Sequence, residues 1–166
     1  MDVKPVNNIK GLALQFAITQ LGITETAKNS SPQIDKYLKS VGLGPGYAWC
    51  QAFVFFCFQE AAKQLATANP LPKTAGVLAC WNKTTPNSRI TKSEALQDPS
   101  LLQPGYQFIM DFGKGLGHTG IIERIEGDVL HTIEGNSNDA GSREGTEVCR
   151  RTRKIGDKPM KGFIKY

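Results

Sequence analysis

The most apolar part of the chain reads Ala48-Trp49-Cys50-Gln51-Ala52-Phe53-Val54-Phe55-Phe56-Cys57-Phe58. The segment before it, Gly42-Leu43-Gly44-Pro45-Gly46, forces a loop, and the positions after it turn polar. We expect a helix over residues 48–66 that is apolar nearly all round at its start. Such a helix belongs at the centre of a domain, because every face of it must be buried. The longest apolar stretch, near Ala52–Phe58, is far short of the roughly 18–20 apolar residues that a membrane span needs.

The rest of the sequence divides into a helical part and, after residue 105, a part made of strands. Further helices are predicted over residues 8–21, Pro32–Ser40 and 74–81, and residues 82–103 look like loop with short helical turns. After Pro104-Gly105 the pattern changes to strands. These are expected over residues 106–112, 118–125, 129–134, 147–153 and 162–165. Helices followed by strands predict an α+β fold, in which an antiparallel sheet packs on a helical layer.

Composition limits the classes of function. The 166 residues suit one domain over 1–166, and 40% hydrophobic with 21% charged residues is ordinary for a globular protein. The net charge of +5 favours a polyanionic environment, but Lys and Arg gather only at Arg150, Arg151, Arg153 and Lys154, so we expect no nucleic-acid partner. The N-terminus shows no secretion signal, so the chain works in the cytosol, is carried out by other means, or has lost its signal.

Four cysteines at irregular spacing form neither a disulfide framework nor a zinc site. Cys57, Cys80 and Cys149 are interpreted as small buried hydrophobic residues. Cys50 differs, because it lies where the buried helix begins. Unpaired N–H groups and the helix dipole stabilise a thiolate there, which would make Cys50 a nucleophile, and nearby N–H groups could bind an oxyanion.

The remaining polar candidates lie on two consecutive strands. His118 is flanked by Gly117 and Gly120, and Glu134 and Asn136 end the next strand. If Glu126-Gly127-Asp128 is the connecting loop, Gly120 faces Glu134 and His118 faces Asn136. Even-numbered side chains then share one face, within reach of the His118 ring. A Cys–His–Glu/Asn site assembles if this face meets the start of the Cys50 helix. His131 has the opposite parity and is expected to be structural.

Three segments in this order resemble the CHAP family: Tyr47-Ala48-Trp49-Cys50-Gln51-Ala52-Phe53-Val54, Gly117-His118-Thr119-Gly120-Ile121-Ile122 and Ile133-Glu134-Gly135-Asn136. CHAP proteins are cysteine, histidine-dependent amidohydrolases/peptidases with a papain-like, NlpC/P60-related fold. The resemblance covers roughly residues 32–166. It implies that Cys50 is the nucleophile and His118 the general base, that Glu134 holds and polarises His118, and that Asn136 is the fourth polar member. Tyr47 and Trp49 could line the substrate cleft or pack in the core.

The resemblance also implies a substrate. Family members mostly cut peptidoglycan, either as N-acetylmuramoyl-L-alanine amidases or as endopeptidases within the peptides. Some members bind calcium through an Asp-rich loop before the nucleophile, but residues 41–46 hold no carboxylate, so we expect no metal and no cofactor. Without a wall-binding repeat, the chain fits a small phage lysin or an antibacterial toxin injected between bacteria, with an immunity protein as partner. Either would be made in the cytoplasm and act in the periplasm or wall. A cysteine amidase for a non-wall amide and a non-catalytic binding module are the alternatives.

Overall fold

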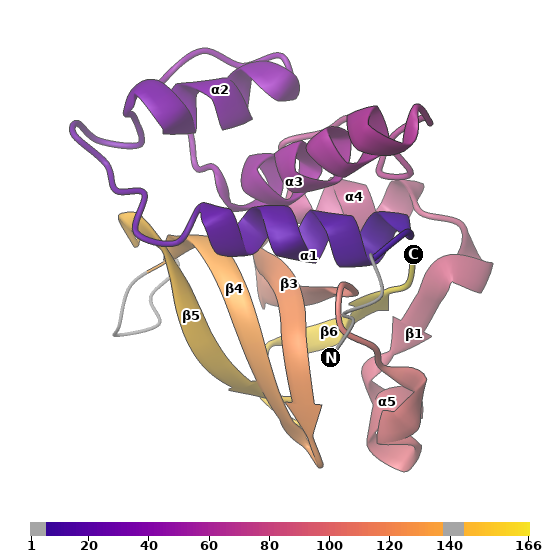
Figure 1. Cartoon of the computed structure of the whole chain (residues 1–166). Helices are drawn as coiled ribbons and strands as arrows, with labels where there is room; N and C mark the ends of the chain where they lie inside the picture. The colour runs from indigo at the N-terminus through magenta and orange to yellow at the C-terminus, as the bar shows by residue number, and fades with distance from the viewer. Residues whose placement is uncertain (1–5, 138–144) are drawn as a thin grey trace.

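The computed structural model describes residues 6–137 and 145–166 and shows a helical layer packed on a sheet (Figure 1). The helices of this layer are α1 (Ile9–Thr19), α2 (Pro32–Ser40), α3 (Cys50–Leu65) and α4 (Val77–Lys83). The sheet contains β1 (Arg89–Thr91), β2 (Gln107–Gly113), β3 (Leu116–Glu126), β4 (Val129–Ser137), β5 (Glu147–Lys154) and β6 (Met160–Ile164). All neighbouring strands are antiparallel, in the order β1-β6-β2-β3-β4-β5. The predicted α+β class is therefore confirmed.

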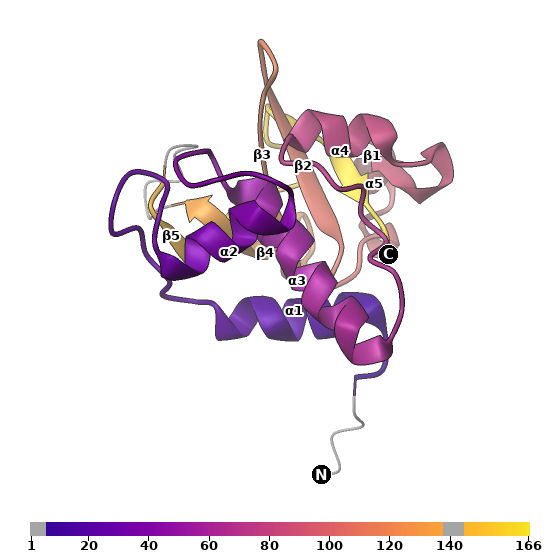
Figure 2. The same cartoon turned by 90° about the horizontal axis from the view of Figure 1, so that it is seen from above.

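Helix α3 forms the centre of the molecule, as its sequence predicts. Figure 2 shows α1, α2 and α3 seen from above, and both α1 and α2 pack against α3. The side chains at the start of α3, such as Phe53 and Phe58, have no exposed surface, and they share a core with Ile121 and Ile133 of the sheet. The helix ends at Ala66, which adopts a left-handed conformation that closes the last turn. No helix among the described residues is long and apolar enough to cross a membrane.

The segment between α4 and β2 is more ordered than its sequence indicates. It contains the short edge strand β1, the helix α5 (Lys92–Gln97) and two single 3-10 turns, η1 (Pro86–Ser88) and η2 (Pro99–Leu101). Thr91 and Glu94 form a capping box that starts α5, with the Glu94 side chain accepting a hydrogen bond from the Thr91 N–H. The polar composition of this segment hides β1, because its partner β6 is distant in sequence.

The β3–β4 hairpin corrects the predicted turn. Its loop has two residues, Gly127-Asp128, so Glu126 pairs with Val129 and the predicted pairing near the turn is wrong by one residue. Gly127 takes a positive φ of 62°, which suits the tight two-residue turn. A bulge between Ile122 and Arg124 then absorbs one residue. Beyond the bulge the pairing of Ile121 with Ile133 agrees with the predicted register, and the ladder ends at this pair.

The face that packs on the helices is the odd-numbered one. Ile121 and Ile133 join the core around α3, whereas Ile122 and Leu130 join a second core on the other face with Phe163. The β3–β4 ladder runs only from Ile121 and Ile133 towards the turn. The even-numbered face therefore does not lie flat against α3, and the candidate site forms beyond the end of this ladder.

Candidate active site

Cys50 is the first residue of α3, as expected. Only 5% of its surface is exposed, and it packs with Val77, Cys80 and Ile109. The residue before the helix, Trp49, makes no side-chain capping hydrogen bond. The first-turn N–H groups beside Cys50 therefore keep the partial positive charge that favours a thiolate or an oxyanion.

His118 connects Cys50 with Glu134. Its Nε2 lies 2.7 Å from Oε1 of Glu134. Its Nδ1 is buried and has no nitrogen or oxygen partner among the described residues. Burial would lower the pKa of His118, but hydrogen bonding to the Cys50 thiol and to Glu134 outweighs it and raises the pKa to about 9. Because Nε2 faces Glu134, the Cys50 thiol belongs to the Nδ1 side of the ring.

The carboxylate of Glu134 is fully buried and accepts hydrogen bonds from several side chains. Besides the His118 ring, Oγ1 of Thr132 donates at 2.6 Å, and the guanidinium of Arg153 donates from Nε at 2.9 Å and from Nη2 at 2.5 Å. Burial would raise the pKa of Glu134, but the bonds from Arg153 and His118 lower it to about 2. Glu134 is therefore ionised throughout the ordinary pH range and stabilises a protonated His118.

Arg153 is the site residue that sequence reasoning missed. It appears in the sequence as one of several basic residues near the C-terminus, and only the pairing of β5 with β4 brings it to Glu134. One signal could have found it. A carboxylate predicted to be buried needs a compensating cation, and the neighbouring strand offers arginines at alternate positions on the same face.

Two glycines in the site motifs allow close approach. A Cβ on Gly120 would lie 2.7 Å from Cγ of Glu134 and 2.8 Å from the Phe108 ring. A Cβ on Gly135 would lie 2.7 Å from the Trp49 ring and 2.8 Å from Phe53. Gly120 thus leaves room for the Glu134 side chain, and Gly135 lets the start of α3 approach β4.

The other predicted site residues occupy different environments. Asn136 is buried, two residues beyond Glu134, with a left-handed φ of 54°, and its catalytic role stays a prediction. Tyr47 is 56% exposed, three residues before Cys50, so it is available to a substrate. Trp49 has no exposed surface, stacks on Tyr37 and donates from Nε1 to Glu25 at 2.9 Å. This placement favours the core-packing alternative for Trp49.

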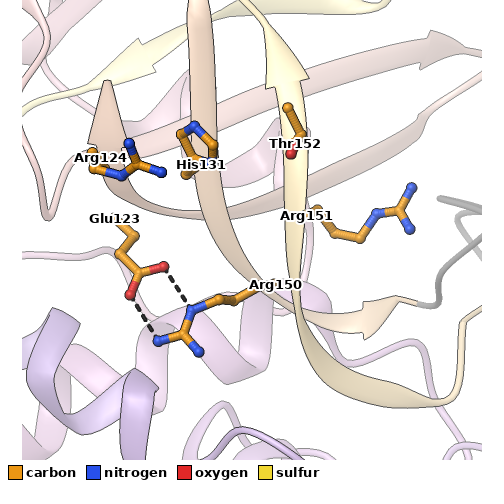
Figure 3. A pocket seen from close by; sticks show the side chains of 6 residues that line it. All are labelled: Glu123, Arg124, His131, Arg150, Arg151 and Thr152. Atoms are coloured by element: carbon orange, nitrogen blue, oxygen red, sulfur yellow. Dashed lines mark hydrogen bonds and ion pairs between the residues drawn. The ribbon is translucent and has the colours of Figure 1, made fainter. Parts of the chain in front are cut away.

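A separate cavity of about 630 Å³ lies over β3, β4 and β5 (Figure 3). Its lining contains His131 and the ion pair between Arg150 and Glu123, whose two hydrogen bonds are both 2.9 Å. Neither Cys50 nor Glu134 belongs to this lining, so His131 lies apart from the candidate active site. Within residues 6–137 and 145–166, no group of three or more His, Cys, Asp or Glu side chains is arranged to hold a metal ion.

Comparison with known proteins places this geometry in a family. The fold is similar to a solved chain titled "The crystal structure of Ly7917", with 14% sequence identity and a TM-score of 0.47 over 94% of this chain and 61% of that one. The chain thus spans less than two thirds of that protein's length. Among curated proteins, none matches the chain. A model of the CHAP domain matches residues 42–136, more than half of the 166 residues, so the chain belongs to the CHAP family, which is associated with hydrolysis of peptidoglycan amides.

Proposed function

We propose that the chain is a cysteine peptidoglycan hydrolase that cleaves an amide bond. The observation that carries the proposal is the buried series Cys50–His118–Glu134, in which one imidazole lies between a thiol and a carboxylate that is ionised at neutral pH. A nucleophile, a base and a group that orients the base are the three parts that acyl transfer needs. A binding module has no use for this series, because burying a charged Glu134 is costly.

The reaction follows from the proton positions. With its raised pKa, His118 can take up the proton of the Cys50 thiol as the sulfur becomes the nucleophile. The Cys50 sulfur attacks the amide carbonyl carbon, and first-turn N–H groups of α3 stabilise the oxyanion. The C–N bond then breaks, and the amine leaves with the proton from His118. Water attacks the resulting thioester, gives a proton back to His118, and releases a carboxylic acid and free Cys50.

The proposed substrate is the bacterial wall. Cleavage falls either between the sugar and the stem peptide or within the peptides, and the net charge of +5 suits an anionic polymer. The chain is proposed to be made in a bacterial or phage-infected cytoplasm and to reach the wall by release or delivery, as a small lysin or an injected toxin. For a toxin, an immunity protein that covers Cys50 is the expected partner.

The decisive experiment is mass spectrometry of purified peptidoglycan digested in parallel with wild type and Cys50→Ala. New fragments from wild type alone support the proposal, and their masses separate amidase from endopeptidase cleavage. If no fragments form but Cys50 is alkylated rapidly, the site is intact and the substrate is another amide. If no fragments form and Cys50 reacts slowly, the protein is a binding module. Equal digestion by Cys50→Ala would overturn the mechanism.

A further inference from the structure

The side chain of Gln107, the first residue of β2, lies behind the active site and has no exposed surface. Its Nε2 donates two hydrogen bonds, to Oε1 of Gln51 and to Oγ1 of Thr119, both at 2.8 Å. Its Oε1 accepts from the Tyr166 hydroxyl at 2.8 Å and from the Cys80 thiol at 3.9 Å. A primary amide has two donors and two acceptor positions, so Gln107 uses all of them.

The two partners of Nε2 are the chain neighbours of the reacting groups. Gln51 directly follows Cys50 on α3, and Thr119 directly follows His118 on β3. A single planar NH₂ group therefore joins the element that carries the nucleophile to the element that carries the base. Cys50 and His118 come from distant parts of the chain, so their spacing depends on contacts of this kind between α3 and the sheet.

The orientation of this amide is fixed from both ends. Thr119 donates its own hydroxyl proton to the Phe108 carbonyl at 2.6 Å, so towards Gln107 it acts as an acceptor. Tyr166 is partly buried and its ring packs against Phe58, and its hydroxyl donates to Oε1 of Gln107. Rotating the amide by half a turn would place its carbonyl oxygen against Oε1 of Gln51 and Oγ1 of Thr119, which are themselves acceptors. Gln107 is therefore held in one orientation and cannot exchange its two partners.

We infer that Gln107 is a positioning residue that sets the distance between the Cys50 thiol and the His118 ring. Among the described residues, the Gln107 NH₂ group alone makes hydrogen bonds to both the Gln51 and the Thr119 side chains, so without it α3 can shift relative to β3. Displacements of about 1 Å in an active site can cost about a hundredfold in rate. The inference rests on the proposed cysteine mechanism, but it concerns the thiol–imidazole pair and so can be measured without any substrate.

The test compares Gln107→Met with Tyr166→Phe. Methionine keeps the approximate volume and removes both donors, whereas phenylalanine at 166 removes one bond to the same amide and leaves Gln51 and Thr119 untouched. For each variant, three quantities are measured: the rate of Cys50 alkylation by iodoacetamide as a function of pH, kcat and KM on peptidoglycan fragments, and the free energy of unfolding in urea.

For Gln107→Met we expect alkylation of Cys50 to slow about tenfold at neutral pH and to recover at alkaline pH, since a thiol separated from His118 ionises less readily. We expect kcat to fall roughly a hundredfold with KM little changed. Tyr166→Phe should keep both rates within about threefold. If Gln107→Met does not fold, Gln51→Met is tested instead. It removes one of the two hydrogen bonds of the Gln107 NH₂ group and should give the same change in alkylation.

The inference is overturned if the folded Gln107→Met or Gln51→Met protein keeps the wild-type alkylation profile. It is also overturned if Tyr166→Phe slows alkylation as much, because loss of rate would then follow loss of stability alone. Failure of the proposed function looks different. In that case wild type releases no peptidoglycan fragments, while the alkylation profile still changes in Gln107→Met and not in Tyr166→Phe.

Discussion

Arg153 donates two hydrogen bonds, at 2.9 and 2.5 Å, to the carboxylate of Glu134, which itself is 2.7 Å from His118. The side chain of Arg153 is 12% exposed and that of Glu134 is fully buried. A buried carboxylate normally becomes neutral, because burial penalises its charge. Here the arginine keeps it ionised, so Glu134 can stabilise a protonated His118 without taking its proton.

Replacing Arg153 by Gln should therefore affect both stability and rate. The variant leaves a buried carboxylate without its cation, and breaking a buried ion pair costs about 3–5 kcal/mol. We expect the free energy of unfolding to fall by about 3–5 kcal/mol. The rate of hydrolysis by the protein that remains folded should also fall. Urea denaturation and initial rates at 25 °C, a temperature at which the variant is confirmed to be folded, measure the two effects.

Arg150→Gln is the matched control for this variant. Arg150 makes the same two-bond contact to a carboxylate, at 2.9 Å to each oxygen of Glu123, but on the exposed surface beside the cavity of Figure 3. Exposed pairs contribute about 0–1 kcal/mol, so stability and rate should stay close to wild type. If Arg150→Gln lowers stability and rate as much as Arg153→Gln does, the buried pair of Arg153 with Glu134 contributes no more than an exposed ion pair.

Stability should depend on pH through His118. Its pKa is raised from 6.5 to about 9 in the folded protein, so the folded state holds this proton more tightly than the unfolded chain. The resulting stabilisation is complete below pH 6.5 and is lost as the pH rises towards 9, at a rate on the order of 1 kcal/mol per pH unit. Urea unfolding across this range should show the slope in wild type and in His131→Gln, but not in His118→Gln.

Glu134 should give the opposite dependence in acid. Its folded pKa of about 2 lies below the ordinary 4.5, so the stabilisation is present above pH 4.5 and is lost as the pH falls towards 2. We expect Glu134→Gln to be less stable than wild type near neutral pH and to lose less stability on acidification over this range. If the free energy of unfolding falls equally steeply with decreasing pH in wild type and in Glu134→Gln, the loss of stability belongs to other carboxylates.

The motif glycines should tolerate no side chain. Gly120→Ala places a methyl group 2.7 Å from Cγ of Glu134, and Gly135→Ala places one 2.7 Å from the Trp49 ring. Overpacking of this kind costs about 1–3 kcal/mol, and for Gly120 it should also displace Glu134 from His118 and slow hydrolysis. Gly44→Ala is the control, because nothing lies within 4 Å of its Cβ position. Wild-type melting and rate in Gly120→Ala would contradict the packing argument.

The cysteines should differ in reactivity. Burial raises the pKa of Cys57 well above its usual value and that of Cys80 to about 11, so neither thiol ionises near neutral pH. Cys50 lies against His118 at the start of α3. Brief alkylation of the native protein, followed by digestion and mass spectrometry, should label Cys50 ahead of Cys57 and Cys80. The rapid label should disappear in His118→Gln, and rapid labelling of Cys57 instead would contradict the structure.

The sequence by itself determined the main helices, the five longer strands and the order of the motifs. The apolar run after Gly46 fixed the central helix and put Cys50 at its start, because a helix that is apolar nearly all round at its start must be buried there. Alternation along the later strands predicted that His118 and Glu134 approach each other, and the structure confirms their contact at 2.7 Å. These features are local, since each depends on the spacing of residues within one or two adjacent elements.

Only the tertiary structure decided what surrounds this contact. The bulge after Ile122 restores the register that the two-residue turn displaces, and the pairing of β5 with β4 brings Arg153 to Glu134. The packing of α3 on the sheet brings Gln51 and Thr119 to one amide of Gln107. The contact of Gln107 with Gln51 joins segments far apart in the chain, and the bulge and the choice of Arg153 depend on the exact register between strands, which the periodicity of one strand does not fix. They form because buried polar groups must find partners, and the folded arrangement determines which partners are within reach.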